Sequence, residues 1–173
     1  MKLIHTLGSL AVAGTMLAVL PAGAAMADGT GDTVATFTLV GGSLDVTVEA
    51  GAALTDGAPG AASVTGSLGA VGISDTRGST LGWIVSAASS TFVDGAGSVS
   101  TGVSYDSGAA TASTGTVTTT TEGATSITAV AQVAAGTLAS GNNTASYAST
   151  LTVGLPANAL AGDYEGTVTT SVV

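Results

Sequence analysis

An alternation of apolar and polar residues with a period of two is the feature that most restricts what this chain can fold into. The alternation is clearest at residues 44–49, 98–105, 147–155 and 164–172. In an extended strand this period places the apolar side chains on one face and the polar side chains on the other. From residue 28 onward no segment has the spacing that an amphipathic helix needs. The sequence therefore predicts an all-β protein without a helix longer than a turn or two.

Further strands are expected between glycine or Asp-Gly turn signals, at residues 34–40, 63–73, 81–92, 115–121 and 125–134. With about nine strands in all, the economical arrangement is a single antiparallel β-sandwich of the Ig-like, Greek-key type. The threonine run within 115–121 is interpreted as an exposed strand. An ice-binding solenoid would need a fixed repeat period, and the chain has none.

Residues 1–27 have the order of a secretory signal peptide: a basic start, a short apolar run and a small-residue cleavage site. The apolar run at 7–20 is well short of the ~20 residues that span a membrane. The sequence AMA at 25–27 precedes the expected cleavage, and no cysteine is present for lipid attachment. Residues 28–173 are then expected to be one exported domain at the cell wall or cell surface, without a membrane anchor.

The charge of the predicted exported domain is strongly one-sided. Arg77 is the only positive side chain in residues 28–173, whereas all eleven acidic residues lie there, so the net charge is −10. Binding of nucleic acid depends on neutralising phosphates with lysine and arginine, so nucleic acid is excluded as a partner. Anionic membranes should repel the domain for the same reason.

Catalysis is not expected from this composition. Residues 28–173 contain no histidine, lysine or cysteine, so a serine or threonine nucleophile would lack its usual base. The acidic residues are spread singly along the chain, and the sequence DGTGDT at 28–33 lacks the spacing of a calcium loop. We therefore expect no enzyme, no metal and no cofactor. The sequence Asn142-Asn143-Thr144 matches a glycosylation acceptor, and a polar turn is the preferred interpretation.

The segment SDTRGSTLGW at residues 74–83 holds the only arginine and the only tryptophan of the chain. In one interpretation, Trp83 fills the core and Asp75 pairs with Arg77 in a turn. In the other, Trp83 and Arg77 form a binding patch for sugar rings or acidic groups. The two interpretations are compatible if the Trp83 ring is buried and Arg77 lies at the rim of a binding site.

Two longer segments carry motifs: VGISDTRGSTLGWIVSAASSTFV at 71–93 and LTVGLPANALAGDYEGTVTTSVV at 151–173. They resemble the WxL-type cell-wall-binding domain of Gram-positive surface proteins. In that family a V-x-D-x-R-G turn leads into G-W-x-[LV], and a Y-x-G-[TS]-[LIV]-T-W-x-L strand ends the domain. The matching residues are Asp75, Arg77, Gly78, Gly82, Trp83, Val85, Tyr164, Gly166, Thr167, Val168 and Thr169. Thr170 replaces the second tryptophan and Val172 the leucine, as in an actinobacterial variant of the family.

The resemblance implies an exported protein held non-covalently on peptidoglycan, alongside other wall proteins. The residues it offers as binding candidates are Asp75, Arg77, Trp83 and Tyr164. For Tyr164 a structural role is preferred, because the spacing from Pro156 resembles a tyrosine corner, in which the hydroxyl bonds back to the preceding loop.

Two classes of function follow. The first is a non-catalytic surface protein that associates with peptidoglycan or with partner surface proteins. The alternative is a structural subunit that self-associates through sheet edges into a surface layer or fibre. Sheet edges without lysine are poorly protected against pairing with another chain, which favours this alternative.

Overall fold

The computed structural model of the chain describes residues 29–94, 97–98 and 100–173. The predicted signal peptide at 1–27 lies outside these residues. The chain divides into two units, one ending at Phe37 and the other comprising Thr38–Val173, and the second unit contains every described strand. Within the described ranges there is no helix, and hence none that could cross a membrane.

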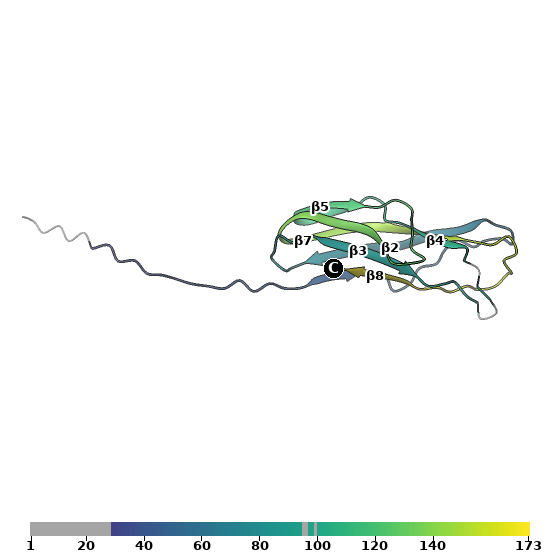
Figure 1. Cartoon of the computed structure of the whole chain (residues 1–173), viewed down its shortest axis with the longest axis horizontal. Coiled ribbons are helices and arrows are strands. Elements are labelled where there is room, and N and C mark those ends of the chain that lie inside the picture. The colour runs from purple at the N-terminus through teal and green to yellow at the C-terminus, as the bar shows by residue number, and fades with distance from the viewer. Residues whose placement is uncertain (1–28, 95–96, 99) are drawn as a thin grey trace, which may run out of the picture. The chain divides into compact units, whose positions relative to one another are not determined.

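The second unit consists of antiparallel strands, which confirms the predicted all-β class (Figure 1). The described strands are β1 (Leu44–Thr47), β2 (Ser63–Asp75), β3 (Trp83–Ser89), β4 (Gly102–Asp106), β5 (Thr111–Thr121), β6 (Thr125–Ser126), β7 (Ala131–Gly154) and β8 (Val168–Val172). Glycine-rich and proline-containing connections separate most of them, as the turn signals indicated.

Strand β7 is the central element, because it is 24 residues long and pairs with β2, β3, β4 and β5. Its second part faces β2, from Ser63 opposite Gly154 to Asp75 opposite Asn143. Its first part faces β3, where Trp83 lies opposite Gly136. The chain leaves β2 and enters β3 across the middle of β7, so the segment 76–82 is held beside that strand.

The predicted sandwich is replaced by a single connected sheet that nearly closes on itself like a barrel. The strand order is β1-β2-β7-β3-β8, and the remaining strands pair along β7 and β4. Long β7 continues from one part of the sheet to the other, so two separate layers do not form. The end strands β1 and β8 approach to within 8 Å between Cα atoms, yet no described ladder joins them. We call the gap between these two strands the seam.

Three expectations about local structure are wrong. The strand expected at 125–134 is divided between β6 and the start of β7, and the strand expected at 147–155 is the end of the same β7, because β7 continues through residues 135–146. The polar turn expected at Asn142-Asn143-Thr144 is also strand, and Asn143 is buried there. The strand expected at 34–40 is not formed, and its large apolar residues are exposed.

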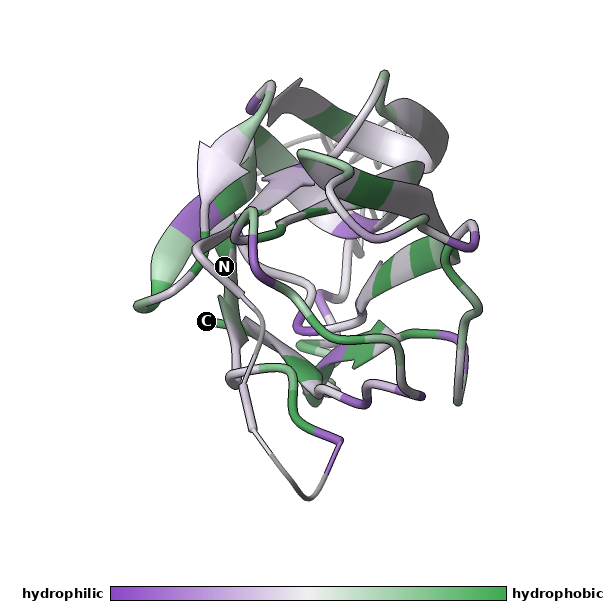
Figure 2. Ribbon diagram, turned by 90° about the vertical axis from the view of Figure 1, so that its right-hand side faces the viewer, coloured by the Kyte–Doolittle hydropathy of each residue, from purple (hydrophilic) through white to green (hydrophobic). Residues whose placement is uncertain are grey.

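The core is built from small and medium apolar side chains with a few aromatic rings. Figure 2 shows hydrophobic and hydrophilic bands alternating along the strands, as the period of two requires. Trp83 is 3% exposed and Tyr105 is 1% exposed, so the largest rings lie inside. A Cβ at Gly136 would lie 2.2 Å from the Trp83 indole, so only glycine permits this packing of ring on backbone.

Candidate functional site

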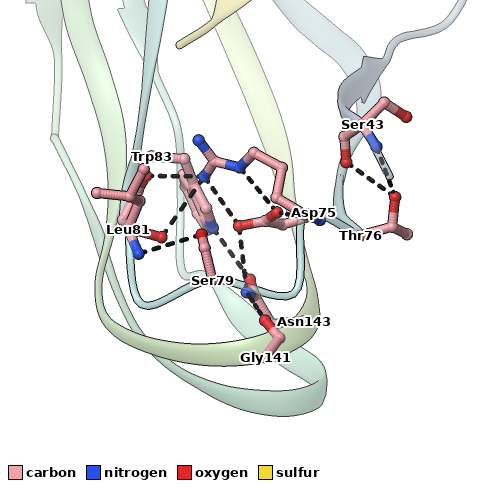
Figure 3. A network of polar contacts seen from close by, with 10 residues as sticks. Ser43, Asp75, Thr76, Ser79, Leu81, Trp83, Gly141 and Asn143 are labelled. Atoms are coloured by element: carbon pink, nitrogen blue, oxygen red, sulfur yellow. Dashed lines mark hydrogen bonds and ion pairs between the residues drawn. The ribbon is translucent and has the colours of Figure 1, made fainter. Parts of the chain in front are cut away.

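Asp75 and Arg77 form a bidentate ion pair in the turn after β2 (Figure 3). Arg77 Nε donates to Asp75 Oδ1 at 2.9 Å, and Arg77 Nη2 donates to Asp75 Oδ2 at 2.9 Å. The backbone N–H of Arg77 also donates to Asp75 Oδ1, at 3.0 Å. The pair predicted from the sequence is therefore present. Asp75 is 1% exposed and the Arg77 side chain 25%, so the carboxylate is buried and the guanidinium lies at the rim.

Arg77 also connects the turn to the strand that carries the tryptophan. Its Nη2 donates to the carbonyl oxygen of Gly82 at 2.9 Å, one residue before Trp83. The turn needs glycine at Gly78, which has a φ of 64°, because this left-handed conformation strains other residues. The guanidinium thus holds both ends of the segment 75–82 together.

Asn143 of β7 joins the ion pair to the indole ring. Its Oδ1 accepts from Trp83 Nε1 at 3.1 Å, and its Nδ2 donates to Asp75 Oδ2 at 3.4 Å. Both partners are buried, so these bonds replace contacts with water that burial removed. The network of Asp75, Arg77, Trp83 and Asn143 therefore links the turn, β3 and β7, and we call it the turn network.

The electrostatics of the turn network favour the charged carboxylate. The Arg77 side chain, through its hydrogen bonds, lowers the pKa of Asp75 below its ordinary value of 3.8, although burial opposes this effect. Asp75 in turn raises the pKa of Arg77. Both groups stay charged at neutral pH.

Acidification is expected to remove this contribution to stability. Because the pKa of Asp75 is lower in the folded state, the unfolded state takes up the proton first. The stabilisation is complete well above pH 3.8 and disappears as the pH falls through the folded pKa. Urea unfolding of the parent and of Asp75→Asn between about pH 7 and pH 2 measures it. The difference in unfolding free energy between them should shrink toward low pH, and a constant difference would contradict the assignment.

Tyr164 lies apart from the turn network, between Gly162 and β8. Its hydroxyl donates to the carbonyl oxygen of Leu160 at 3.0 Å, four residues upstream, which is the local bond expected of a tyrosine corner. Burial, followed by the nearby Asp94 carboxylate, raises the pKa of the Tyr164 hydroxyl. Its hydroxyl is therefore engaged in fixing the loop that leads into β8.

A groove opens along the seam, between residues 48–59 and residues 159–170. It consists of two adjoining cavities of about 300 Å³ and about 690 Å³, sizes found among ligand sites. Leu54 and Phe92 line both cavities. We call this feature the seam groove.

The wall of the seam groove is shaped by glycine. A Cβ at Gly166 would lie 2.8 Å from the Phe92 ring, so the backbone passes directly over the ring face. Sequence reasoning matched Gly166 to a motif without finding this contact. Phe92 was placed only at the end of an expected strand.

Two of the residues that line the smaller cavity carry buried hydroxyl groups. These residues are Tyr105 and Ser149, each 1% exposed, and within the described ranges neither Tyr105 Oη nor Ser149 Oγ has a hydrogen-bond partner. Nearby, burial raises the pKa of the Tyr147 hydroxyl far above its ordinary value, with a smaller contribution from Tyr105.

The structure brings three of the four candidate residues together and leaves Tyr164 separate. Asn143, which completes the turn network, was missed because two adjacent asparagines are typical of turns. Among the described residues no group of three or more histidine, cysteine or acidic side chains could hold a metal ion. The buried indole of Trp83 is not available for stacking on a sugar ring in this structure, and ligand binding by the four residues stays a prediction.

Comparison with known proteins gives no relative on which to base a function. No protein-family model matches the chain, and neither the search of curated proteins nor that of solved structures finds a match.

Proposed function

We propose that the chain is an exported, non-catalytic cell-surface protein that associates non-covalently with cell-wall peptidoglycan or with partner surface proteins. The fold type proposed with this function is an Ig-like, Greek-key arrangement whose sheet is nearly closed. The proposal takes the first 27 residues as a signal peptide and the WxL resemblance as a guide to the class of ligand.

The observation that supports the proposal is the convergence of motif residues in space. Asp75, Arg77 and Trp83 belong to the motif on which the resemblance depends, and they meet in one hydrogen-bonded network. The network explains why these residue types occur together: their hydrogen bonds fix the turn on a rigid strand. Residues on a loop held by a rigid scaffold are well placed to form a binding surface. The exposed part of that turn includes Leu81, which is 63% exposed beside the guanidinium.

We expect the purified domain, residues 28–173, to sediment with washed Gram-positive cell walls. Leu81→Ser should lower the bound fraction several-fold if the turn contacts the wall, because an exposed apolar side chain beside a cation is a typical contact. Val130→Ser is the matched control, because Val130 is 76% exposed in the connection between β6 and β7. Thermal unfolding checks that both variants are folded.

Binding of the parent at the level of an unrelated acidic protein would refute wall association. Equal loss of binding in Leu81→Ser and Val130→Ser would refute the assignment of the wall contact to the turn that carries Leu81. Purified peptidoglycan, compared with whole walls, separates the polymer from partner surface proteins.

The second candidate function is a self-associating structural subunit, and the sheet edges favour it. In the part of the chain that the structure describes, β1 pairs only with β2 and β8 only with β3, so each has an edge without a ladder. Strand β8 has no charged residue, and charges on an edge are the usual protection against pairing with another chain.

A further inference from the structure

The seam groove is lined by acidic side chains along both of its cavities. Glu49 and Glu165 line the smaller cavity, and Asp56, Asp163 and Glu165 line the larger one. All four side chains are exposed. Among the described residues, no lysine, arginine or histidine lines either cavity. A cleft lined by charges of one sign concentrates the electrostatic potential, so this groove attracts positively charged groups.

The four carboxylates of the groove are not neutralised within the protein. In the described part of the chain, none of them has an ion pair or a side-chain hydrogen bond. Arg77 is the one basic side chain that the structure describes, and it is bonded to Asp75 in the turn network. The negative charge of the groove is therefore available to a ligand.

Between the acidic residues the lining of the groove is largely apolar. Leu54 and Phe92 line both cavities, and the other large aliphatic lining residues include Leu68, Val71, Val64 and Leu155. A lysine or arginine side chain matches this combination, because its aliphatic stem lies along apolar surface while its charged head stays at the rim. Apolar side chains next to such a basic residue would find contacts in the same groove.

The smaller cavity also has hydrogen-bonding groups that are not used within the protein. Tyr105 and Ser149 line this cavity, and their buried hydroxyls have no partner in the described ranges. Buried polar groups are normally hydrogen-bonded, so a donor from a bound molecule would complete them. The ammonium head of lysine carries three donors and no acceptor.

The arrangement of charge distinguishes between possible cationic ligands. Within the described ranges no group of three or more histidine, cysteine or acidic side chains could hold a metal ion, so a single cation is a poor match. The carboxylates are instead distributed over two adjoining cavities of about 300 Å³ and about 690 Å³. A chain with several separated positive charges fits this distribution. A second copy of the domain does not, because its net charge is −10.

We propose that the seam groove binds a basic segment of a partner surface protein, in which lysine or arginine alternates with apolar side chains. The basic heads pair with the groove carboxylates, and the apolar side chains contact Leu54 and Phe92. This inference rests on the partner-protein form of the proposed function and names the chemistry of that partner. Complementary charge mainly gives specificity and fast association, and salt screens it.

Fluorescence anisotropy with a labelled peptide of alternating lysine and leucine tests the proposal on residues 28–173. We expect this peptide to bind, and its affinity to fall as sodium chloride is added. A lysine–serine peptide of equal length should bind several-fold more weakly, because its apolar contacts are lost. A glutamate–leucine peptide should not bind, because like charges repel.

Glu165→Gln is the variant that tests the location, because Glu165 lines both cavities. We expect it to lower the affinity for the lysine–leucine peptide about threefold to fivefold, the effect of one exposed charge pair. Glu122→Gln is the matched control: it removes the same charge between β5 and β6, outside the groove lining, and should bind as the parent does. Both side chains are exposed, so thermal unfolding should be unchanged.

The absence of lysine from residues 28–173 allows the contact to be located directly. A carbodiimide joins a lysine amine of the bound peptide to a neighbouring carboxylate as an amide, and the reagent takes up the water that this bond releases. Mass spectrometry then identifies the linked residue. We expect links to Glu49, Asp56, Asp163 or Glu165, and none to Glu122.

The contrary results separate this inference from the function on which it rests. Equal binding of the lysine–leucine and glutamate–leucine peptides, or equal weakening by Glu165→Gln and Glu122→Gln, refutes a basic ligand in the groove. A parent that sediments with cell walls but does not bind the lysine–leucine peptide refutes this inference alone. A parent that binds the peptide in the groove but does not sediment refutes wall association alone. Displacement of the peptide by purified peptidoglycan would assign the groove to the polymer and overturn the partner-protein assignment.

Discussion

Trp83→Ala is expected to lower the free energy of unfolding by about 3–5 kcal/mol, the usual cost of removing a large buried ring. The ring is 3% exposed and packs against the backbone at Gly136, which has no side chain that could fill the space. The substitution also removes the donor to Asn143 Oδ1, which would stay buried. Urea unfolding followed by circular dichroism measures the change, because no tryptophan remains in the variant.

Two controls separate the contributions of the Trp83 ring. Ile84→Ala changes the neighbouring residue of β3, whose side chain is 42% exposed, and should cost much less. Trp83→Phe keeps much of the side-chain volume and removes the hydrogen bond to Asn143. Its loss of stability should therefore lie between those of Ile84→Ala and Trp83→Ala. A nearly unchanged stability of Trp83→Ala would contradict the burial of the ring and return Trp83 to the ligand-binding candidates.

Arg77→Gln is expected to lower the free energy of unfolding by about 3–5 kcal/mol, because it leaves a buried carboxylate without its cation. Asp75 is 1% exposed, and Asn143 Nδ2 at 3.4 Å would remain as a single long side-chain donor. The partial exposure of Arg77 places the expected effect toward the lower end of that range. Thermal and urea unfolding at neutral pH measure it.

The double variant Asp75→Asn/Arg77→Gln is the matched control for this effect. Removing both charges avoids the unpaired carboxylate, so the double variant should be more stable than the sum of the single effects predicts. A cost of Arg77→Gln below about 1 kcal/mol would instead mark an exposed, weakly contributing pair. A folded Arg77→Gln of unchanged stability that no longer sediments with cell walls would make Arg77 a direct contact.

The sequence predicted local strand structure well where the alternation was regular. Strand β1 follows the alternation at 44–49, and β2 follows the expected strand at 63–73 with two more residues. The Asp75–Arg77 pair could be predicted because the two residues are neighbours in the chain and no other cation lies in the predicted domain. Both features involve residues close together in the chain, so the spacing of residues in the sequence is enough to predict them.

Contacts between residues far apart in the chain could not be predicted from the sequence in the same way. Asn143 contacts Trp83 and Asp75 only because the register of β7 places it opposite Asp75. Register depends on tertiary packing, and glycines and asparagines in the middle of β7 are typical of turns. The segment 34–40 illustrates the opposite case: its composition predicted a strand, and none is formed there, because local composition does not supply a partner strand.

The position of β7 late in the chain also has a consequence for the kinetics of folding. Strands β2, β3, β4 and β5 all pair with residues 131–154, so a nascent chain lacks the partner of its main ladders until most of it has been synthesised. The ladder from Ser63 to Gly154 closes a long loop, and such non-local pairing slows folding. A chain of this topology should therefore remain unfolded through most of its synthesis, which is the state that the export we propose for it would require.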